Sequence, residues 1–403
     1  MDRAVRSARD RERPEPRWPA PRRLVCGLAA TLAVVVGVVA LPAPAPAQPE
    51  VGEDEQAAER EGSVEPGPIR VRDQFILGVA YLQLDPESAD LLPSGSWQID
   101  VIQSATNNWV QSEEIEDLLE GREQRQPLTL EELQAVEPVR ESSGLYLADG
   151  EAYRLSVKVR HSLTDWMQLA VTLPVMKFSG GFGDTPIQEM HELLGIDQGG
   201  REGVPRNEYT IYIRPGGPGG GTELYVDEAP SAGLGDVSSS LKVRLSPRAA
   251  RWAVALEGVV EFPTGDARKL YGSGELDFGG QLLATLDAER SCFHLGLGVV
   301  RTGGSELLAA VSPRTVLNLF AGYERAVSER WAWVAQTTFS ESPLADLAIR
   351  ALSEDQFLID LAIKRSLGGD GRGTVFLAFS ENFRNFGNSP DLGLHLGFSR
   401  TWR

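Results

Sequence analysis

The sequence predicts an all-β protein: an antiparallel transmembrane β-barrel of about 12 strands, behind an N-terminal signal peptide. Apolar and polar residues alternate with a period of two in segments that recur from Ser96 to the C-terminus. These segments are about 10–13 residues long, and a tilted strand needs ~9–11 residues to cross a bilayer. The connections between them are short and long in turn, as in outer-membrane barrels.

The N-terminus predicts export. Residues 1–23 carry eight arginines and four acids, residues 24–41 form an uncharged apolar run, and Ala45-Pro46-Ala47 fits the small-residue pattern before a signal-peptidase cut. We therefore assign 1–47 to a signal peptide. An uncleaved membrane anchor is the alternative, because this run of 18 residues is just long enough to span a bilayer.

Charge and composition exclude several function classes. The formal net charge is −18, and cleavage of the signal peptide would leave −22. A protein that binds nucleic acid or the phosphates of anionic lipids needs positive charge, so no nucleic-acid partner is expected. The two cysteines, Cys26 and Cys292, cannot form a cysteine-ligated metal site. The sequence has no second long apolar run, so any later membrane crossing is expected to use strands.

The chain after the signal peptide divides into an acidic, flexible lead-in (48–70) and the barrel (71–403). The strands are predicted at 96–110, 145–160, 165–178, 235–246, 251–262, 274–286, 290–302, 314–326, 330–341, 354–366, 372–383 and 391–402. Residues 74–84 are either an internal plug or an extra strand, and residues 207–227 are interpreted as a hairpin on a long loop. Counting both would give 14 or more strands.

Each predicted strand has one apolar and one polar face. In 357–364, for example, Leu361 and Ile363 alternate with Asp360, Ala362 and Lys364. A soluble β-sandwich would show the same alternation, but the strand length favours a barrel, as do aromatic residues near the strand ends. These are Trp97, Trp109, Trp166, Phe178, Trp252, Phe262, Trp331, Phe339 and Trp402. Leu361→Arg is therefore expected to cost about 2–4 kcal/mol, and Ala362→Arg on the lumen face to be tolerated.

The alternation also predicts the side chains that line the lumen. They are Asp100, Arg154, Lys158, Arg160, Lys242, Arg244, Glu257, Glu261, His294, Glu324, Asp360, Lys364 and His395. One interpretation is a salt-bridge network that rigidifies a narrow barrel. The other is a polar pore with a basic side on 154–160 and 242–244. The near balance of basic and acidic groups argues against strong ion selectivity.

The long loop 179–234 is predicted to be a lid or plug. Asp184 or Thr185 can cap a short helix that Gly195 ends, and Pro186 fits its first turn. We expect this helix to fold over or into the barrel mouth. Its polar side is predicted to carry Asp184, Glu189, His191 and Arg201. A metal site is a weaker interpretation, because HELLG at 191–195 lacks the second His of a zinc HExxH motif.

Six stretches carry a family resemblance. They are GPIRVRDQ (67–74), QSATNNW (103–109), DGEAYRLSV (149–157), SGGFGDTPIQEMHELLGIDQGGR (179–201), GLGD (233–236) and PTGDARKLYGSGELDF (263–278). They resemble the bacterial outer-membrane family called domain of unknown function 3187, from about Gly67 to the C-terminus. That family usually carries a bulky residue where Gly183 stands here. The resemblance implies an outer-membrane barrel and gives neither a substrate nor a reaction.

Together these features predict an outer-membrane channel or binding protein for a small solute, hydrophobic solutes included. The alternative is a structural or surface-interaction barrel with a closed lumen. A hydrolase is a second alternative, although the sequence has no GxSxG element and an enzyme is not expected. The expected partners are outer-membrane lipid and, during biogenesis, the barrel-assembly machinery. We expect a monomer without a cofactor.

Overall fold

The computed structural model describes residues 65–139, 143–195, 197–217, 221–248, 250–367, 372–382 and 386–402. The predicted signal peptide and residues 48–64 of the predicted lead-in lie outside the described residues. Among the residues that are described, no helix is both long and apolar enough to cross a bilayer.

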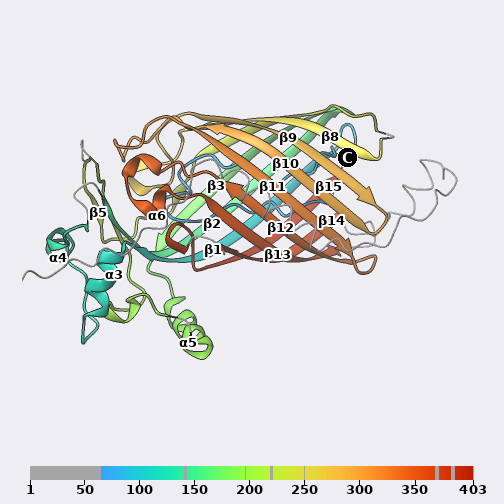
Figure 1. Ribbon diagram of the computed structural model, residues 1–403. Coiled ribbons are helices and arrows are strands. Elements are labelled where there is room, and N and C mark those ends of the chain that lie inside the picture. Colours follow the sequence, from blue (N-terminus) through green and yellow to red (C-terminus); the bar gives the residue numbers. More distant parts are fainter. Residues whose placement is uncertain are drawn as a thin grey trace, which may run out of the picture. The chain divides into compact units, whose positions relative to one another are not determined.

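Twelve long antiparallel strands form a closed barrel (Figure 1). They are β1 (Trp97–Gln111), β2 (Leu145–Thr164), β3 (Met167–Ser179), β7 (Val237–Arg244), β8 (Trp252–Phe262), β9 (Asp277–Ala288), β10 (Ser291–Arg301), β11 (Thr315–Ala326), β12 (Trp331–Ser340), β13 (Gln356–Leu367), β14 (Gly373–Asn382) and β15 (Leu392–Trp402). The barrel closes because β1 pairs with β2 on one side and with β15 on the other. The predicted fold class is therefore confirmed, and each of the twelve predicted ranges overlaps one observed strand.

The outer wall is apolar, whereas the inner wall carries the polar and charged residues together with apolar ones such as Ala362. On β13, Leu361 and Ile363 are 54% and 56% exposed, whereas Asp360, Ala362 and Lys364 are buried. Outward-facing side chains of this kind are suited to hydrocarbon. At the end with the short turns, Trp97, Trp166, Trp252, Trp331 and Trp402 are exposed, as expected of an aromatic belt. Trp109 and Phe178 are buried instead, so their assignment to such a belt was wrong.

Beyond the barrel rim, at the end with the long loops, the sheet continues as a small extension. β2 pairs there with β4 (Thr210–Arg214), and β4 pairs with β5 (Leu224–Val226). The predicted hairpin at 207–227 thus continues the wall. The helices α3 (Glu113–Glu120) and α4 (Leu130–Ala135) cover its outer face, where Ile115, Leu119 and Leu133 join one buried apolar cluster with residues of β1, β2 and β4.

The remaining elements belong to the long loops. They are α5 (Asp184–Leu194), η1 (Arg201–Gly203), β6 (Gly233–Leu234), η2 (Ala267–Lys269), η3 (Ala345–Leu347), α6 (Arg350–Ser353) and η4 (Phe386–Asn388). α3, α4, α5 and α6 gather at one end of the barrel (Figure 1). The loops that contain η2, η3 and α6 pack inward at this end, where Leu270, Leu347 and Leu352 are buried.

Candidate functional site

A segment near the N-terminus fills the lumen. Residues 65–95, which we call the plug, run through the barrel twice before β1 begins. Near the short-turn end, Lys364 Nζ donates to the backbone carbonyls of Glu65 (2.8 Å) and Gly67 (2.9 Å). At the long-loop end, the Ile76 amide donates to Asn108 Oδ1 (3.2 Å). The segment then returns to the short-turn end, where the Gly95 amide donates to the Ser162 carbonyl (2.8 Å).

The rising limb of the plug, residues 65–74, is held by side chains of the wall. The amides of Gly67 and Ile69 donate to Glu324 (2.7 Å) and Gln336 (3.1 Å). Ile69 and Val71 also pack with Ala362 in a buried apolar cluster. Residues 65–70 therefore belong inside the barrel, and their assignment to a flexible lead-in was wrong. Residues 74–84 were interpreted as either a plug or an extra strand; they are part of the plug and form no strand.

The tip of the plug, residues 75–82, is sealed by apolar packing. Phe75, Ile76 and Leu77 are at most 1% exposed. They share one buried cluster with side chains of the long loops and the sheet extension, including Tyr271 and Leu347. Burial of this much apolar surface closes the long-loop end of the lumen to water.

The returning limb of the plug, residues 83–95, carries three acids that meet basic residues of the wall. The Glu87 carboxylate, 1% exposed, accepts from Lys158 Nζ (2.6 Å) and Lys242 Nζ (2.9 Å). Asp85 accepts from Lys158 (3.1 Å), and Asp90 pairs with Arg244 (3.0 Å). The limb is therefore attached to β2 and β7 mainly through charge.

The two limbs of the plug are also joined to each other. Arg70 Nε donates to Glu87 Oε1 (3.0 Å), and Arg72 Nε donates to Asp85 Oδ1 (2.5 Å). Arg72 also reaches Glu261 on β8 (3.5 Å). The plug thus behaves as a hairpin whose arginines cross-link its limbs and contact the wall.

The structure places all the predicted lumen residues on the inner wall. Twelve of the thirteen predicted lumen residues are buried, and Arg244 is half-buried. Their partners are Ser156 for Arg154, Asp100 for Arg160, Gln281 for Glu257, Thr285 for His294, Ser380 and Gln336 for Asp360, and Glu324 for Lys364. Lys158, Arg160 and Lys242 are brought together around Glu87.

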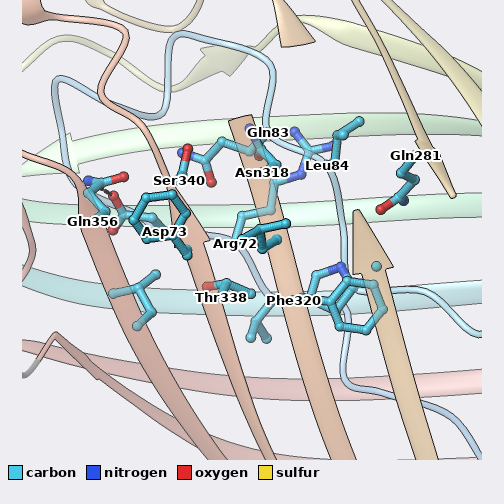
Figure 2. Close-up of a pocket in the computed structure, with 16 residues that line it drawn as sticks. Arg72, Asp73, Gln83, Leu84, Gln281, Asn318, Phe320, Thr338, Ser340 and Gln356 are labelled. Atoms are coloured by element: carbon cyan, nitrogen blue, oxygen red, sulfur yellow. Dashed lines mark hydrogen bonds between the residues drawn. The ribbon is translucent and has the colours of Figure 1, made fainter. Parts of the chain in front are cut away.

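The space left beside the plug is small. A cavity of about 40 Å³ lies between the limbs and the strands β9 and β11–β13, where Arg72, Asp73 and Leu84 face Asn318 and Gln356 (Figure 2). Two further cavities measure about 20 Å³ each. Such volumes hold a few water molecules, whereas a small-molecule site needs ~300 Å³ or more. Among the described residues, these cavities beside the plug are thus too small to admit a solute.

The predicted lid does not cover the mouth. α5 stands outside the barrel wall (Figure 1), and its loop is attached to the outer face of β1 and β2. Asn107 on that face donates to Asp184 (3.2 Å) and accepts from Arg201 Nη2 (3.2 Å). The lid prediction was therefore wrong about the surface that the helix covers.

The four predicted lid residues do not form one cluster. Asp184 and Arg201 are buried and meet through Asn107, and Arg201 also pairs with Asp391. Glu189 is exposed and His191 is half-buried. A Cβ at Gly183 would lie 2.6 Å from the Glu151 carboxylate that accepts its amide, so a larger residue at this position would require the Glu151 side chain to move. The described residues contain no group of three or more His, Cys, Asp or Glu placed to hold a metal ion.

One buried serine–histidine contact bears on the hydrolase interpretation. Ser380 Oγ lies 3.0 Å from His395 Nε2, on the inner wall. The carboxylate beside this pair, Asp360, accepts from the serine, and His395 Nδ1 lies 2.8 Å from Ser104 Oγ. A nucleophilic triad needs the carboxylate on the far nitrogen of the histidine. This pair therefore lacks the arrangement that activates a serine.

The plug acids Asp85, Glu87 and Asp90 were not predicted from the sequence, because no motif marks them. A usable signal was present nonetheless: three acids stand directly before the first strand, and the predicted lumen has basic residues concentrated on two of its strands. Charge complementarity between the two sets would have indicated that this stretch lies inside the barrel.

Comparison with known proteins identifies the family of this chain. The profile of the family described as "Protein of unknown function (DUF3187)" matches residues 139–402. The chain belongs to this family. The DUF3187 match spans β2 to β15, so the plug and β1 lie before the matched region. A search of curated proteins found no match.

Several solved outer-membrane proteins are similar to this chain in structure. The COG4313 outer membrane channel from Pseudomonas putida F1 is 8% identical, with a TM-score of 0.45, over 79% of this chain and 100% of that one. The NanC porin is 9% identical, with a TM-score of 0.39, over 75% and 98%. A Pseudomonas aeruginosa FadL homologue is 10% identical, with a TM-score of 0.32, over 83% and 99%. The barrel assignment rests on the strand pairing of the chain itself.

Proposed function

We propose that this protein is a gated outer-membrane channel for a small polar solute, and that the plug inside the lumen is its closed state. In this proposal the short turns face the periplasm and the plug must leave its position before a solute can pass. The observation that carries the proposal is the composition of the lumen: a charged inner wall filled by a separate segment of the chain.

The size of the barrel supports this function. An eight-stranded barrel is narrow enough for wall side chains to fill, whereas barrels of 16–18 strands leave an aqueous channel. With twelve strands, the wall of this barrel leaves room that the plug occupies. Displacement of the plug would therefore open a bore lined by polar and charged groups.

The way the limbs are attached also supports a gate. Hydrogen bonds and ion pairs, such as those of Lys242 and Lys364, join the limbs to the wall alongside apolar contacts of Ile69 and Val71. A buried ion pair gains little net free energy, because desolvation offsets much of the attraction. The limbs can therefore exchange their polar contacts for water at modest cost, and only the apolar contacts oppose displacement.

The lining favours a polar solute over a hydrophobic one. On the described inner wall, charged residues occupy every second inward position in parts of two strands: Arg154 and Lys158 on β2, with Ser156 between them, and Glu257 and Glu261 on β8, with Val259 between them. A hydrophobic solute would have to displace water from these groups without replacing their hydrogen bonds. Hydrophobic compounds are therefore not the class that we propose.

A reversible cross-link tests the gate. Ser88 Oγ of the plug lies 3.2 Å from Thr285 Oγ1 of β9. The variant carries Ser88→Cys and Thr285→Cys, with Cys26 and Cys292 replaced by Ser, and is studied in planar bilayers. The disulfide should hold the plug in the lumen and suppress unitary currents. Reduction should restore the currents of the unlocked protein.

The control is a disulfide that uses the same wall residue, Thr285, but does not involve the plug. Thr285 lies opposite His294 on the neighbouring strand β10. The variant with Thr285→Cys and His294→Cys links wall to wall, and its currents should not depend on reduction. Equal currents in the oxidised and reduced plug-linked variant would contradict gating by the plug.

A second candidate function is a structural or surface-interaction barrel with a permanently closed lumen. The observation in its favour is the apolar seal at the plug tip, where Phe75, Ile76 and Leu77 are fully buried. This function predicts that no unitary currents appear in the reduced variant at any voltage.

A further inference from the structure

The centre of the lumen holds a carboxylate surrounded by four cations. Glu87 Oε1 lies 2.6 Å from Lys158 Nζ and 3.0 Å from Arg70 Nε. Glu87 Oε2 lies 2.9 Å from Lys242 Nζ and 3.8 Å from an Arg160 guanidinium nitrogen. Each carboxylate oxygen thus faces two cationic groups, and the carboxylate is shielded from solvent.

Three of these four cations belong to the barrel wall. Lys158 and Arg160 are on β2, Lys242 is on β7, and β3 lies between these two strands in the sheet. Arg154 on β2 and Arg244 on β7 extend the same basic side. These side chains stay in place when the plug moves, because they are attached to hydrogen-bonded strands of the barrel.

The plug supplies the counter-charge of this basic side. Asp85, Glu87 and Asp90 of the returning limb pair with Lys158, Lys242 and Arg244. When the plug leaves, five wall cations remain, and the acids near them are Asp100 on β1 and Glu257 and Glu261 on β8. Five cations and three acids leave this side of the wall with a net positive charge that the plug acids offset, although charge around the whole wall is nearly balanced.

We propose that Lys158, Arg160 and Lys242 form the solute site of the open channel, and that the solute is a small anion bearing a carboxylate. Glu87 occupies this site in the closed state. The inference rests on the proposed channel function and adds the solute class. Two ammonium groups and a guanidinium match the two oxygens of a carboxylate, and a partly desolvated cation cluster strongly favours an anionic occupant.

The same site couples the solute to the gate. A free carboxylate and the Glu87 carboxylate compete for the same cations, so the solute binds only the state in which the plug is displaced. A ligand with this preference shifts the population toward the open state. The solute should therefore open its own channel.

The experiment measures ion selectivity of the full chain in planar bilayers. The opening variant carries Asp85→Asn and Glu87→Gln, which remove two counter-charges of the basic side without changing the wall. The reversal potential in a KCl gradient should show a severalfold preference for chloride over potassium. Citrate, as an anionic probe, should bind and reduce the current, whereas the cation spermine at equal concentration should not.

The control variants separate the site from general charge effects. Adding Lys242→Gln to the opening variant should remove most of the chloride preference and of the block by citrate. Lys177→Gln makes the same change on β3, between β2 and β7 in the sheet, where the side chain is exposed on the outer face. It should leave both properties unchanged. Heat-dependent mobility in gels checks that each barrel is folded.

The outcomes distinguish the two proposals. Unitary currents that lack a chloride preference, or that Lys242→Gln does not alter, would overturn the anion site and leave the gated channel standing. An absence of currents in both the opening variant and the reduced plug-linked variant would overturn the channel function and the anion site together. If the opening variant does not fold, Ala362→Arg provides an independent way to displace the rising limb, since Ala362 packs against Ile69 and Val71.

Discussion

Lys242 shows how the role of a single side chain depends on what fills the barrel. The strand register places it directly opposite Glu257, yet its ammonium donates to Glu87 and to the Ser88 carbonyl of the plug, both at 2.9 Å. Glu257 accepts from Gln281 instead (2.8 Å). Alternation predicted that Lys242 points inward. It could not predict the partner, because that partner stands 155 residues earlier in the chain.

Leu361 and Ala362 test the assignment of the two faces at the scale of one residue. Leu361 is 54% exposed on the outer wall, so Leu361→Arg should cost about 2–4 kcal/mol near the middle of the bilayer. Urea unfolding of the protein in phospholipid vesicles measures this loss. A stability equal to that of the unsubstituted protein would contradict the lipid-facing assignment.

Ala362→Arg should act differently, and the expectation that it is tolerated needs correction. The lumen beside Ala362 is occupied by Ile69 and Val71 of the plug, so an arginine there has no free volume. Because the wall at this point can accept a polar group once the rising limb moves, we expect a folded barrel with raised conductance. A folded variant without any gain in conductance would show that the limb accommodates the arginine in place.

Among the elements, α5 illustrates what pattern can and cannot predict. A short helix ended by Gly195 was predicted, and the structure has one at Asp184–Leu194. The predicted cap by Asp184 or Thr185 was wrong, because Gly183 is the N-cap residue and no described side chain caps the helix. Its placement depends on tertiary contacts with Asn107 and Glu151 on the outer wall, and these leave no periodic trace in the loop sequence. The strands, by contrast, were predictable because membrane and lumen impose opposite polarity on successive residues.

Asn107→Ala should release the α5 loop from the wall. The variant loses the hydrogen bonds to Asp184 and Arg201, and a hydrogen bond to a charged group contributes about 1.5–3 kcal/mol. Trypsin cleavage after Arg201 or Arg206 should become faster while unfolding of the barrel is unchanged. The control is Glu189→Gln, at an exposed position of the same helix, which trypsin should cleave as slowly as the unsubstituted protein. Equal cleavage rates in the Asn107→Ala and Glu189→Gln variants would contradict the attachment of the loop through Asn107.

The stability of the loop between β8 and β9 should depend on pH, because Asp236, just before β7, holds this loop. Its carboxylate accepts the amides of Gly265 (2.7 Å) and Ser273 (3.1 Å). Burial raises the pKa of Asp236 from 3.8 to about 6, although these donors oppose the shift. Since protonation is easier in the folded state, the loop should be most stable below pH 3.8 and lose stability as pH rises through about 6.

Amide protection factors of Gly265 and Ser273, measured by NMR against pH, check this dependence. In Asp236→Asn the protection should no longer vary with pH in that window. Protection that increases with pH in the unsubstituted protein would show that the amide donors, and not burial, decide the pKa of Asp236.

For the whole molecule, the sequence predicted the barrel better than its contents. The twelve strands, their faces and their inward charges follow from the local alternation of apolar and polar residues. The plug shows almost no such alternation, since Phe75, Ile76 and Leu77 are consecutive and all buried. The charge balance of the lumen was predicted from the wall alone. Including the plug acids changes that conclusion, because they neutralise one side of the wall and not the other.

The central claim is that the plug closes the lumen and leaves it when the channel opens. Ser88 of the returning limb is 7% exposed, so a cysteine there should be protected in the closed state. The most direct measurement is the reaction rate of Ser88→Cys, with Cys26 and Cys292 replaced by Ser, toward a charged thiol reagent during bilayer recording. We predict that this rate rises in proportion to the fraction of time the channel is open. Current through a channel whose introduced thiol stays as unreactive as in the closed state would contradict the claim.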